Sequence, residues 1–325
     1  MSEHRLQEIR EHIDQLDESI VGLLNKRAAL SREVGELKSR SLDTVFKPFR
    51  EKEVLNRLHS LGPGILPEDH LQAIYREILS SSRRLQQPQT VAYLGPEGTF
   101  THQAALEYLG RSMNFTPCPT LHDVFLTVAS RKADLGVIPL ENSLQGSVGQ
   151  SLDLFLHYPV YIHAELYSRI SHALLSSSTE LAQVRTVYSH PQALAQCSAW
   201  LRTNLPQAIV VPVDSTATAA ARAEHEGQNA AAIGHPQLIE RYSLRPLAMD
   251  IQDLPDNWTR FLVIGPTPTQ SSSRDKTTLL FTTPDKPGAL AAILNLLADQ
   301  GLNLTKLESR PLKGEKWKYV FFMDV

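Results

Sequence analysis

Two cationic residues, Arg27 and Lys38, lie in a long helical stretch whose spacing directs both side chains the same way. Apolar residues recur at steps of four and three over residues 9–37, a pattern typical of a coiled-coil seam. Arg27 occupies one position of that seam, and Lys38 lies about 20° away around the helix and roughly 16 Å further along it. A charge in an apolar seam is costly unless an anion meets it, so the pair favours a buried site for a dianion. The alternative is that both side chains extend to solvent.

Polar residues also gather at the predicted ends of four β-strands, in residues 95–102, 139–147, 189–192 and 214–216. Sheets of α/β proteins bind ligands at the carboxyl ends of their strands, and helix N-termini offer free N–H groups to anions. Each cluster alone is explained as well by a tight turn or a helix cap. The clusters at 139–147, 189–192 and 214–216 together favour a site for carboxylates, with His190 either the candidate acid or base or a structural residue.

The elements that would position these residues form three units. Residues 1–88 predict three helices, the first from about residue 3 to residue 39 and the second opening at Pro48. Residues 90–266 alternate β-rich runs with amphipathic helices, which predicts an α/β domain with mainly parallel sheets, as one body or as two lobes around a cleft. After a linker at 266–275, residues 276–325 predict a β-α-β-β unit, an incomplete ferredoxin-like fold.

Composition excludes several classes of protein. The chain has 325 residues, a net charge of −3 and 42% hydrophobic residues, which suits two or three domains with their own cores. The near-neutral charge argues against nucleic-acid binding, no apolar run reaches membrane-spanning length, and the charged N-terminus is unlike a signal peptide. The two cysteines, Cys118 and Cys197, predict neither a disulfide framework nor a metal site, so we expect a cytoplasmic protein.

The order of the motifs resembles one family, the bifunctional chorismate mutase–prephenate dehydratases. The helical unit is similar to the all-helical chorismate mutases. The middle resembles prephenate dehydratase through VAYLGPEGTFTH, PLENSLQGSV, YSHPQALAQC, DSTATAA and NWTRFLVIG, and the tail resembles an ACT regulatory domain through PGAL and ESRP. The resemblance implies a multidomain fold: an all-α mutase domain (1–88), a two-lobed, periplasmic-binding-protein-like α/β dehydratase domain (90–266) and a partial ferredoxin-like α+β ACT domain (276–325).

The resemblance implies that the helical domain rearranges chorismate to prephenate, with no covalent step, by holding the folded substrate and stabilising charge on the breaking ether oxygen. The matching family positions are Arg10, Arg27, Lys38, Arg50, Glu51, Ser82 and Gln86. The arginines would bind carboxylates, Lys38 and Gln86 would contact the ether oxygen, and Glu51 would hold the hydroxyl. The long helices would form a homodimer in which Arg10 reaches the partner's site. Lys47 stands where some relatives carry Asp, which leaves hydroxyl recognition to backbone or weakens it.

In the dehydratase domain, the resemblance implies that prephenate loses its ring hydroxyl and carbon dioxide to give phenylpyruvate. Thr259 of the TRF motif would be the key residue, and because its hydroxyl is a poor acid at neutral pH we interpret it as a hydrogen-bond donor. Matching pocket residues are Glu141, Asn142, Ser189, Gln196 and Ser215. Arg260 would pair with a substrate carboxylate or brace its loop.

In the ACT domain, the resemblance implies that phenylalanine binds between two subunits and inhibits. Gly288 would permit close backbone approach, and a loop formed by residues 308–311 would close over the ligand. The matching positions are Gly288, Ala289, Leu290, Glu308, Ser309, Arg310 and Pro311. The unit lacks a last helix and strand, so we expect a truncated or degenerate domain.

Neither reaction implied by the resemblance needs a cofactor or a metal. Two other interpretations stay open. One is a dehydratase whose helical domain is merely regulatory, in which replacing Lys38 with Ala would change little. The other is a non-catalytic sensor of small ligands, which would bind phenylalanine without converting prephenate.

Overall fold

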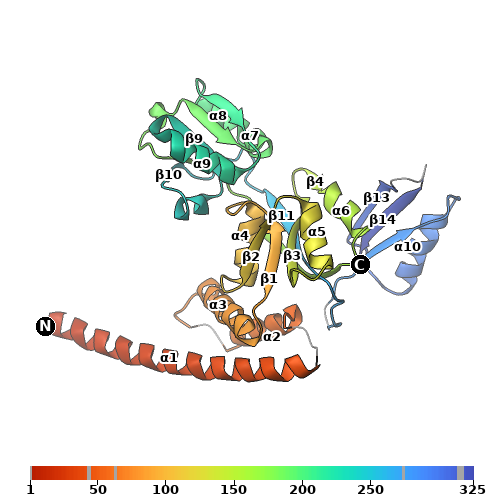
Figure 1. Cartoon of the computed structure of the whole chain (residues 1–325), viewed down its shortest axis with the longest axis horizontal. Helices are drawn as coiled ribbons and strands as arrows, with labels where there is room; N and C mark the ends of the chain where they lie inside the picture. Colours follow the sequence, from red (N-terminus) through yellow and green to blue (C-terminus); the bar gives the residue numbers. More distant parts are fainter. Residues whose placement is uncertain (1, 42–44, 62–63, 273–274, 313–317) are drawn as a thin grey trace. The chain divides into compact units, whose positions relative to one another are not determined.

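The computed structural model describes the chain except at residues 1, 42–44, 62–63, 273–274 and 313–317, and its elements are labelled in Figure 1. The sequence also predicts that Gly62-Pro63-Gly64 ends the second helix; residues 62–63 and part of the predicted linker lie outside the described residues. The chain divides into two compact units, residues 1–268 and residues 269–325. Within the described residues, no helix is long and apolar enough to cross a membrane.

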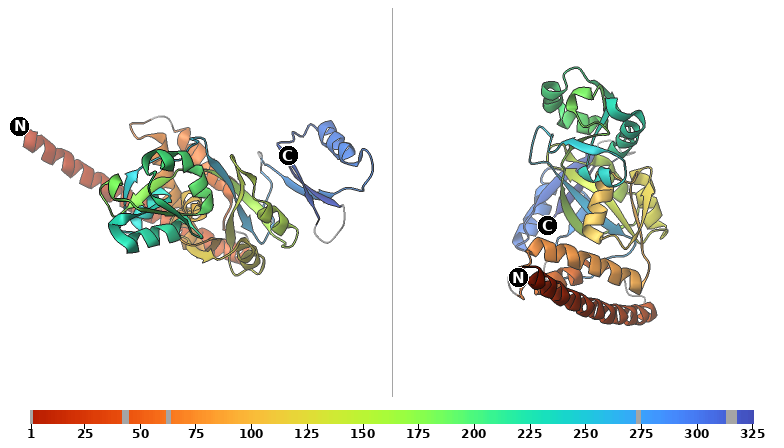
Figure 2. Two further views of the ribbon diagram at one scale, coloured as in Figure 1. Left: turned by 90° about the horizontal axis from the view of Figure 1, so that it is seen from above. Right: turned by 90° about the vertical axis from the view of Figure 1, so that its left-hand side faces the viewer.

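The first unit begins with three helices, α1 (Ser2–Ser41), α2 (Pro48–His59) and α3 (Glu68–Gln86). Helix α1 runs along α3, as two of the views show (Figures 1 and 2). Gly35 makes this contact possible, because a Cβ atom there would lie 2.6 Å from the backbone oxygen of Gln86. A larger residue at position 35 would therefore push the two helices apart.

The leucines of the apolar seam of α1 do not pack on α3, although Arg27 in the same seam does contact it. Leu16, Leu23 and Leu30 are 62%, 65% and 64% exposed, whereas Arg27 and Lys38 are partly buried. The helix therefore satisfies only part of its pattern within this chain, and its longest apolar stripe has no cover among the described residues.

The first lobe of the α/β domain is a six-stranded mixed sheet in the order β2-β1-β3-β11-β5, with β4 paired to β3. β1 runs parallel to β2 and β3, and β11 runs antiparallel to β3 and β5. Helices α4 and α5 pack on this sheet (Figure 1). The elements are β1 (Thr90–Leu94), α4 (Phe100–Leu109), β2 (Asn114–Cys118), α5 (Leu121–Ala129), β3 (Leu135–Asn142), β4 (Gly146–Ser147), α6 (Gly149–Phe155), β5 (Tyr161–Arg169) and β11 (Trp258–Gly265).

The second lobe is a five-stranded mixed sheet in the order β10-β6-β9-β7-β8. β7 runs parallel to β8 and β9, while β6 runs antiparallel to β9 and β10. Its strands are β6 (Ala173–Ser176), β7 (Thr186–Ser189), β8 (Ile209–Pro212), β9 (Ala230–Gly234) and β10 (Arg245–Ala248). Its helices are the 3-10 turns η1 (Leu181–Gln183), η2 (Gly227–Asn229) and η3 (Pro236–Glu240), with α7 (Pro191–Gln196), α8 (Ser198–Asn204) and α9 (Thr216–Glu226).

The prediction of mainly parallel sheets is wrong, and the two crossings between the lobes explain why. The chain leaves the first lobe after β5 and returns in β11, through residues 170–172 and 249–257. A strand that leaves a lobe and a strand that enters it run in opposite directions when they are neighbours. β5 therefore pairs antiparallel with β11, and β6 with β10. The two-lobed, periplasmic-binding-protein-like architecture itself is as predicted.

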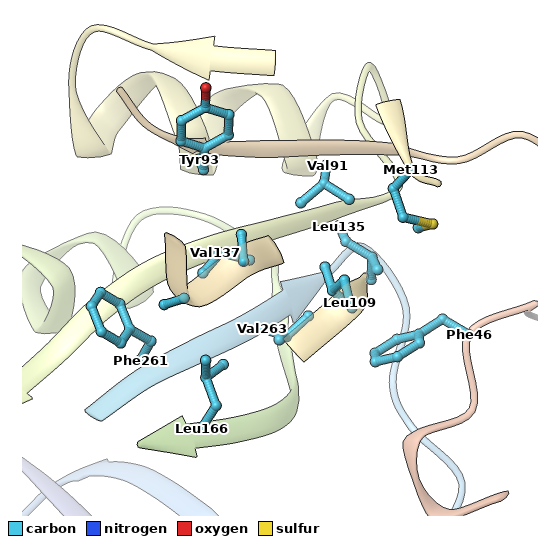
Figure 3. Close-up of a cluster of buried hydrophobic side chains, with 12 residues drawn as sticks. Phe46, Val91, Tyr93, Leu109, Met113, Leu135, Val137, Leu166, Phe261 and Val263 are labelled. Atoms are coloured by element: carbon cyan, nitrogen blue, oxygen red, sulfur yellow. The ribbon is translucent and has the colours of Figure 1, made fainter. Parts of the chain in front are cut away.

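A residue from the helical part completes the core of the first lobe. Phe46, in the connection from α1 to α2, is 3% exposed and packs into the cluster that includes Leu109, Met113 and Val263 (Figure 3). The guanidinium carbon of Arg83 lies 5.6 Å from the centre of the Phe46 ring. The helices are thereby anchored on the first lobe through a buried aromatic ring.

The second unit has the predicted β-α-β-β order, with β12 (Thr278–Thr282), α10 (Ala289–Asp299), β13 (Lys306–Pro311) and β14 (Tyr319–Asp324). Its sheet has the order β12-β14-β13, and both pairings are antiparallel. The predicted loop over residues 308–311 is wrong, because these residues form the end of β13 and pair with β14.

Candidate active sites

Four of the predicted mutase residues lie on the face where α1 meets α3. Arg27 donates a hydrogen bond to Ser82 Oγ, and the Ser82 hydroxyl donates to the carbonyl of Ile78 at 2.7 Å. Lys38 Nζ donates to the carbonyl of Val45 at 3.3 Å. The backbone of Gln86 lies against Gly35 of α1 at the close crossing described above. Arg27 and Lys38 are thus both partly buried on α1, with Ser82 of α3 bonded to Arg27, and the ligand site that their spacing indicates stays a prediction.

Three other predicted mutase residues are not brought onto that face within one chain. Arg50 is exposed and pairs with Glu53 at 2.9 Å. Glu51 accepts a hydrogen bond from the buried Arg83, which also donates to the carbonyl of Leu109 at the end of α4. Arg10 is exposed near the start of α1.

The dehydratase residues Asn142 and Thr259 meet at the ends of β3 and β11. Asn142 Nδ2 lies 3.0 Å from Thr259 Oγ1 and 2.7 Å from the side-chain oxygen of Asn257, and all three residues are buried. The Asn142 oxygen accepts from the backbone N–H groups of Leu144 and Gln145, at 3.1 and 3.2 Å. Because backbone N–H groups only donate, they fix which side of the Asn142 amide faces Thr259.

Arg260 and Glu141 are cross-strand neighbours on β11 and β3. Arg260 is 6% exposed and pairs with Glu165 of β5 at 2.7 Å. Arg260 thus pairs with a neighbouring strand of this sheet, and its role toward the substrate stays a prediction.

The predicted residues of the second lobe lie beyond the carboxyl ends of its parallel strands. Ser189 ends β7, and its hydroxyl donates to the carbonyl of Ile233 at 2.7 Å. Ser215 caps α9 by accepting from the Thr218 N–H at 3.0 Å, and His190 caps α7 through Nδ1. The capping interpretation thus describes what Ser215 and His190 do in this structure.

A buried polar pair joins the second lobe to the crossing segments. Gln196, at the end of α7, accepts from His172 Nε2 at 2.8 Å. His172 is 1% exposed, and burial lowers the pKa of its imidazole. The ring of Phe100, from the start of α4, stands edge-on to His172 and to His235, with centres 5.3 and 5.6 Å apart. Burial, and then the neighbouring His172, lower the pKa of His235 to about 4.

Sequence reasoning singled out neither His172, Asn257 nor Arg83. Asn257 lies inside the quoted NWTRF motif, but nothing in that motif showed its burial. Their partners are 24, 115 and 32 residues away along the chain, so no local spacing could have indicated these contacts.

The predicted effector residues of the second unit do not share one surface. Glu308 and Arg310 alternate with Ser309 along β13, so Ser309 lies on the opposite face of the sheet. Gly288 has a φ of +81°, and nothing lies within 4 Å of the place where a Cβ would be. The backbone conformation, and no close contact within the described chain, therefore explains this glycine.

Three features define a multidomain enzyme that acts on small carboxylates. They are the two cations on the helical domain, the polar centre at the hinge (the crossing segments 170–172 and 249–257 with the adjoining ends of β3 and β11), and the separate β-α-β-β unit. Residues 9–87 match chorismate mutase type II, residues 91–269 match prephenate dehydratase and residues 277–325 match the ACT domain. The chain belongs to the bifunctional chorismate mutase/prephenate dehydratase family. It carries both catalytic domains and an ACT regulatory domain, which confirms the family, the fold class and the link to aromatic amino acid biosynthesis predicted from the motifs.

Two curated bifunctional relatives illustrate the similarity. The chorismate mutase/prephenate dehydratase of Aquifex aeolicus is 45% identical over 324 residues, covering 98% of this chain and 89% of the relative. That of Neisseria gonorrhoeae is 42% identical over 318 residues, covering 97% and 87%.

Among solved structures, prephenate dehydratase from Arthrobacter aurescens in complex with L-Phe is 34% identical, with a TM-score of 0.66, over 72% of this chain and 79% of its own. GqqA, described as a quorum quenching acylase, is 29% identical with a TM-score of 0.66, over 73% and 87%. Because one fold can host different activities, the family assignment depends on three matching domains in order and not on the fold alone.

Proposed function

We propose that prephenate is dehydrated at the hinge between the two lobes, where Thr259 donates a hydrogen bond to the leaving hydroxyl group. One observation carries this proposal. Thr259 Oγ1 accepts from Asn142 Nδ2 at 3.0 Å, and the described residues offer no acceptor for its own hydrogen. Two backbone N–H groups hold the Asn142 amide, so Asn142 can only donate to Thr259. The hydrogen of the Thr259 hydroxyl is therefore available to donate to a ligand.

The proposed step breaks two bonds of prephenate. The electron pair of the bond to the ring carboxylate enters the ring as carbon dioxide leaves, and the carbon–oxygen bond on the opposite ring carbon breaks. The departing hydroxide takes up a proton from solvent, so the products are phenylpyruvate, carbon dioxide and water. A threonine hydroxyl is too weak an acid to supply that proton outright, so Thr259 stabilises the charge that develops on the oxygen.

The carboxylates of prephenate need donors, and the hinge has several nearby. Gln196 and Ser215 lie beyond the carboxyl ends of the second-lobe strands, the usual ligand side of such sheets, whereas the Ser189 hydroxyl at the end of β7 already donates to the Ile233 carbonyl. Arg260 supports the site through Glu165, and Glu141 lies beside Arg260 in the sheet. We propose that Arg260 and Glu141 hold the position of Thr259, which neighbours Arg260 on β11.

We propose that chorismate is rearranged on the α1–α3 face, with Arg27 and Lys38 meeting its negative charge and Ser82 and Gln86 completing the contact. Arg27 is already oriented by Ser82, which favours a preorganised site. Glu51 lies on α2, outside that face, with Arg83 as its partner, and its contact with the substrate hydroxyl stays part of the proposal. Arg50 remains the proposed second carboxylate ligand.

We propose that the enzyme acts in the cytoplasm as a homodimer paired through α1. The exposed seam of α1 supports this arrangement, because leucines at 62–65% exposure along one helix favour association. Arg10 lies about 26 Å from Arg27 along α1, too far to share its site within one chain. In a pair of α1 helices, Arg10 of one chain would complete the site of the other. Both cysteines are unpaired, which suits a reducing compartment.

We propose phenylalanine as the effector of the ACT domain. The relative from Arthrobacter aurescens that was solved with L-Phe supports this choice. The turn at Gly288 that opens α10, and the polar residues at the end of β13, are the proposed contacts.

One experiment tests both activities together. Purified protein is given chorismate alone, and prephenate and phenylpyruvate are measured over time. Formation of phenylpyruvate supports both sites. Accumulation of prephenate would contradict the dehydratase proposal, and untouched chorismate with turnover of added prephenate would favour a merely regulatory helical domain.

A further inference from the structure

Two buried carboxamide groups at the hinge are held in the same unusual way. The side-chain oxygen of Asn257 accepts from Asn142 at 2.7 Å, and that of Gln196 accepts from His172 at 2.8 Å. In both residues the NH2 nitrogen is fully buried and has no partner among the described residues. Each group is therefore anchored at its oxygen and leaves two hydrogens without an acceptor.

Asn257 lies on one crossing segment, and His172, which holds Gln196, lies on the other. The backbone oxygen of Asn257 accepts from the N–H of Ile170 at 2.7 Å, and His172 is two residues further on. His172 in turn accepts at its backbone oxygen from Ile251 at 2.9 Å. Both crossing segments thus meet beside Thr259, which the proposed dehydratase reaction already uses.

A buried amide NH2 group without an acceptor is destabilising, whereas a ligand oxygen in the same place would satisfy it. Prephenate carries two carboxylates, and a carboxylate accepts from several donors at once. Neutral amide donors can bind it here without the desolvation cost of a buried cation.

His172 is suited to hold Gln196. Because a carboxamide oxygen only accepts, Nε2 of His172 carries the hydrogen of this bond. The ring is fixed by the edge of Phe100 and by its place in the crossing segment. Burial, which lowers the pKa of the imidazole, keeps it a neutral donor that adds no charge beside the substrate.

Building on the proposed dehydratase function, we propose that Asn257 is a further substrate-binding residue of that site, donating to a carboxylate of prephenate, and that His172 is the positioning residue that aims the Gln196 amide at the same ligand.

The first test replaces Asn257 with Asp, which keeps the oxygen that Asn142 binds and exchanges the NH2 group for an oxygen. The KM for prephenate should rise roughly 10-fold or more, because a donor is lost and like charge is introduced. Phenylpyruvate keeps only the side-chain carboxylate of prephenate, so its affinity, measured by calorimetry, should fall in parallel if Asn257 binds that carboxylate and stay unchanged if Asn257 binds the ring carboxylate. The mutase activity of the same chain reports its folding, and Asn204→Asp, an exposed position on α8, is the matched control. Unchanged KM and unchanged phenylpyruvate affinity would overturn the assignment of Asn257.

The second test compares His172→Gln with His172→Leu. Gln can place an NH2 group where Nε2 lies, so it should recover most of the kcat/KM that Leu loses. The loss in His172→Leu should also be absent when Gln196 is already Leu, since His172 acts only through that amide. Equal effects of Gln and Leu, or additive effects with Gln196→Leu, would show a merely structural role. If the unsubstituted protein fails to convert prephenate, the proposed function itself is wrong, whatever these variants do.

Discussion

Asn142 Nδ2 lies 3.0 Å from Thr259 Oγ1, although 117 residues separate them in the chain. The bond arises because β11, which returns from the second lobe, pairs antiparallel with β3 and places Thr259 directly opposite Asn142. The Asn142 amide cannot turn around without losing two backbone hydrogen bonds. The pairing of β11 with β3 therefore makes Thr259 an acceptor toward Asn142 and leaves its hydrogen to donate to a ligand.

Removing the Thr259 hydroxyl should abolish most dehydratase activity. Thr259→Val keeps the shape of the side chain and should lower kcat for prephenate by roughly 100-fold or more, as expected when one donor to developing charge is lost. Thr259→Ser keeps the hydroxyl and should retain much more activity. Phenylpyruvate formation is the measurement, and chorismate turnover by the same samples controls for folding. Equal losses of dehydratase activity in Thr259→Val and Thr259→Ser would contradict the donor role of Thr259.

Lys38→Ala should separate the two activities. The variant loses a cation from the α1–α3 face, and chorismate turnover should fall by roughly 100-fold or more. The rate at which the variant converts added prephenate should stay within about twofold of that of the unsubstituted protein, because the hinge site shares no residues with the α1–α3 face. Lys26→Ala, at an exposed position of the same helix, is the control. Normal mutase turnover in Lys38→Ala would support the interpretation that the helical domain is only regulatory.

Features that depend on neighbouring residues in the sequence were predicted, whereas features that depend on contacts between distant residues were not. The β-rich runs of β1, β3, β9 and β11 were recognised because buried strands are apolar throughout. β2 and β10 were missed, since each lies at a sheet edge and contains a proline, Pro117 or Pro246. The buried strand β6 was also missed, because its four residues form only a short apolar run. Arg27 and Lys38 were found from spacing within one helix. Asn257 and His172 were not found, because their roles depend on hydrogen bonds to residues that are distant in the sequence.

Arg83 should be important for stability, since it connects α3 to Glu51 on α2 and to the end of α4. Arg83→Met leaves Glu51 without its partner and the Leu109 carbonyl without a donor. Breaking a buried pair in this way costs about 3–5 kcal/mol, which should lower the melting temperature by several degrees. Arg84→Met, the exposed neighbour, is the control and should change little. Calorimetry that finds the two variants equally stable would contradict this account of the contact.

Acid should destabilise the α/β domain through the partly buried His235. The pKa of His235 is about 4 in the folded protein against 6.5 for the ordinary group, because burial disfavours the charged ring. The unfolded chain therefore binds more protons between these values, so stability is full above about pH 6.5 and falls as the pH drops toward about 4. The loss attributable to His235 is at most about 3 kcal/mol.

Replacing His235 with Asn tests whether His235 causes this loss of stability at low pH. Asn can still cap η3 in place of Nδ1, but it does not titrate. The fall in melting temperature between pH 7 and pH 4.5 should be smaller in His235→Asn than in the unsubstituted protein. His190→Asn makes the same change at the cap of α7 and serves as control. A pH dependence that is identical in His235→Asn and the unsubstituted protein would rule out His235 as a source of acid sensitivity.

Two inactive variants should restore mutase activity when their chains are mixed. If Arg10 of one chain completes the site that contains Lys38 of the other, Arg10→Ala and Lys38→Ala are each inactive alone. A mixed dimer then has one site with both residues intact, and statistical pairing of equal amounts gives about one quarter of all sites active. The measurement is chorismate turnover after the two chains are unfolded and refolded together. Leu16→Glu on the exposed seam should abolish this recovery by preventing pairing, with the molar mass falling to that of one chain. Recovery that persists in a monomeric Leu16→Glu background would show that Arg10 acts within its own chain.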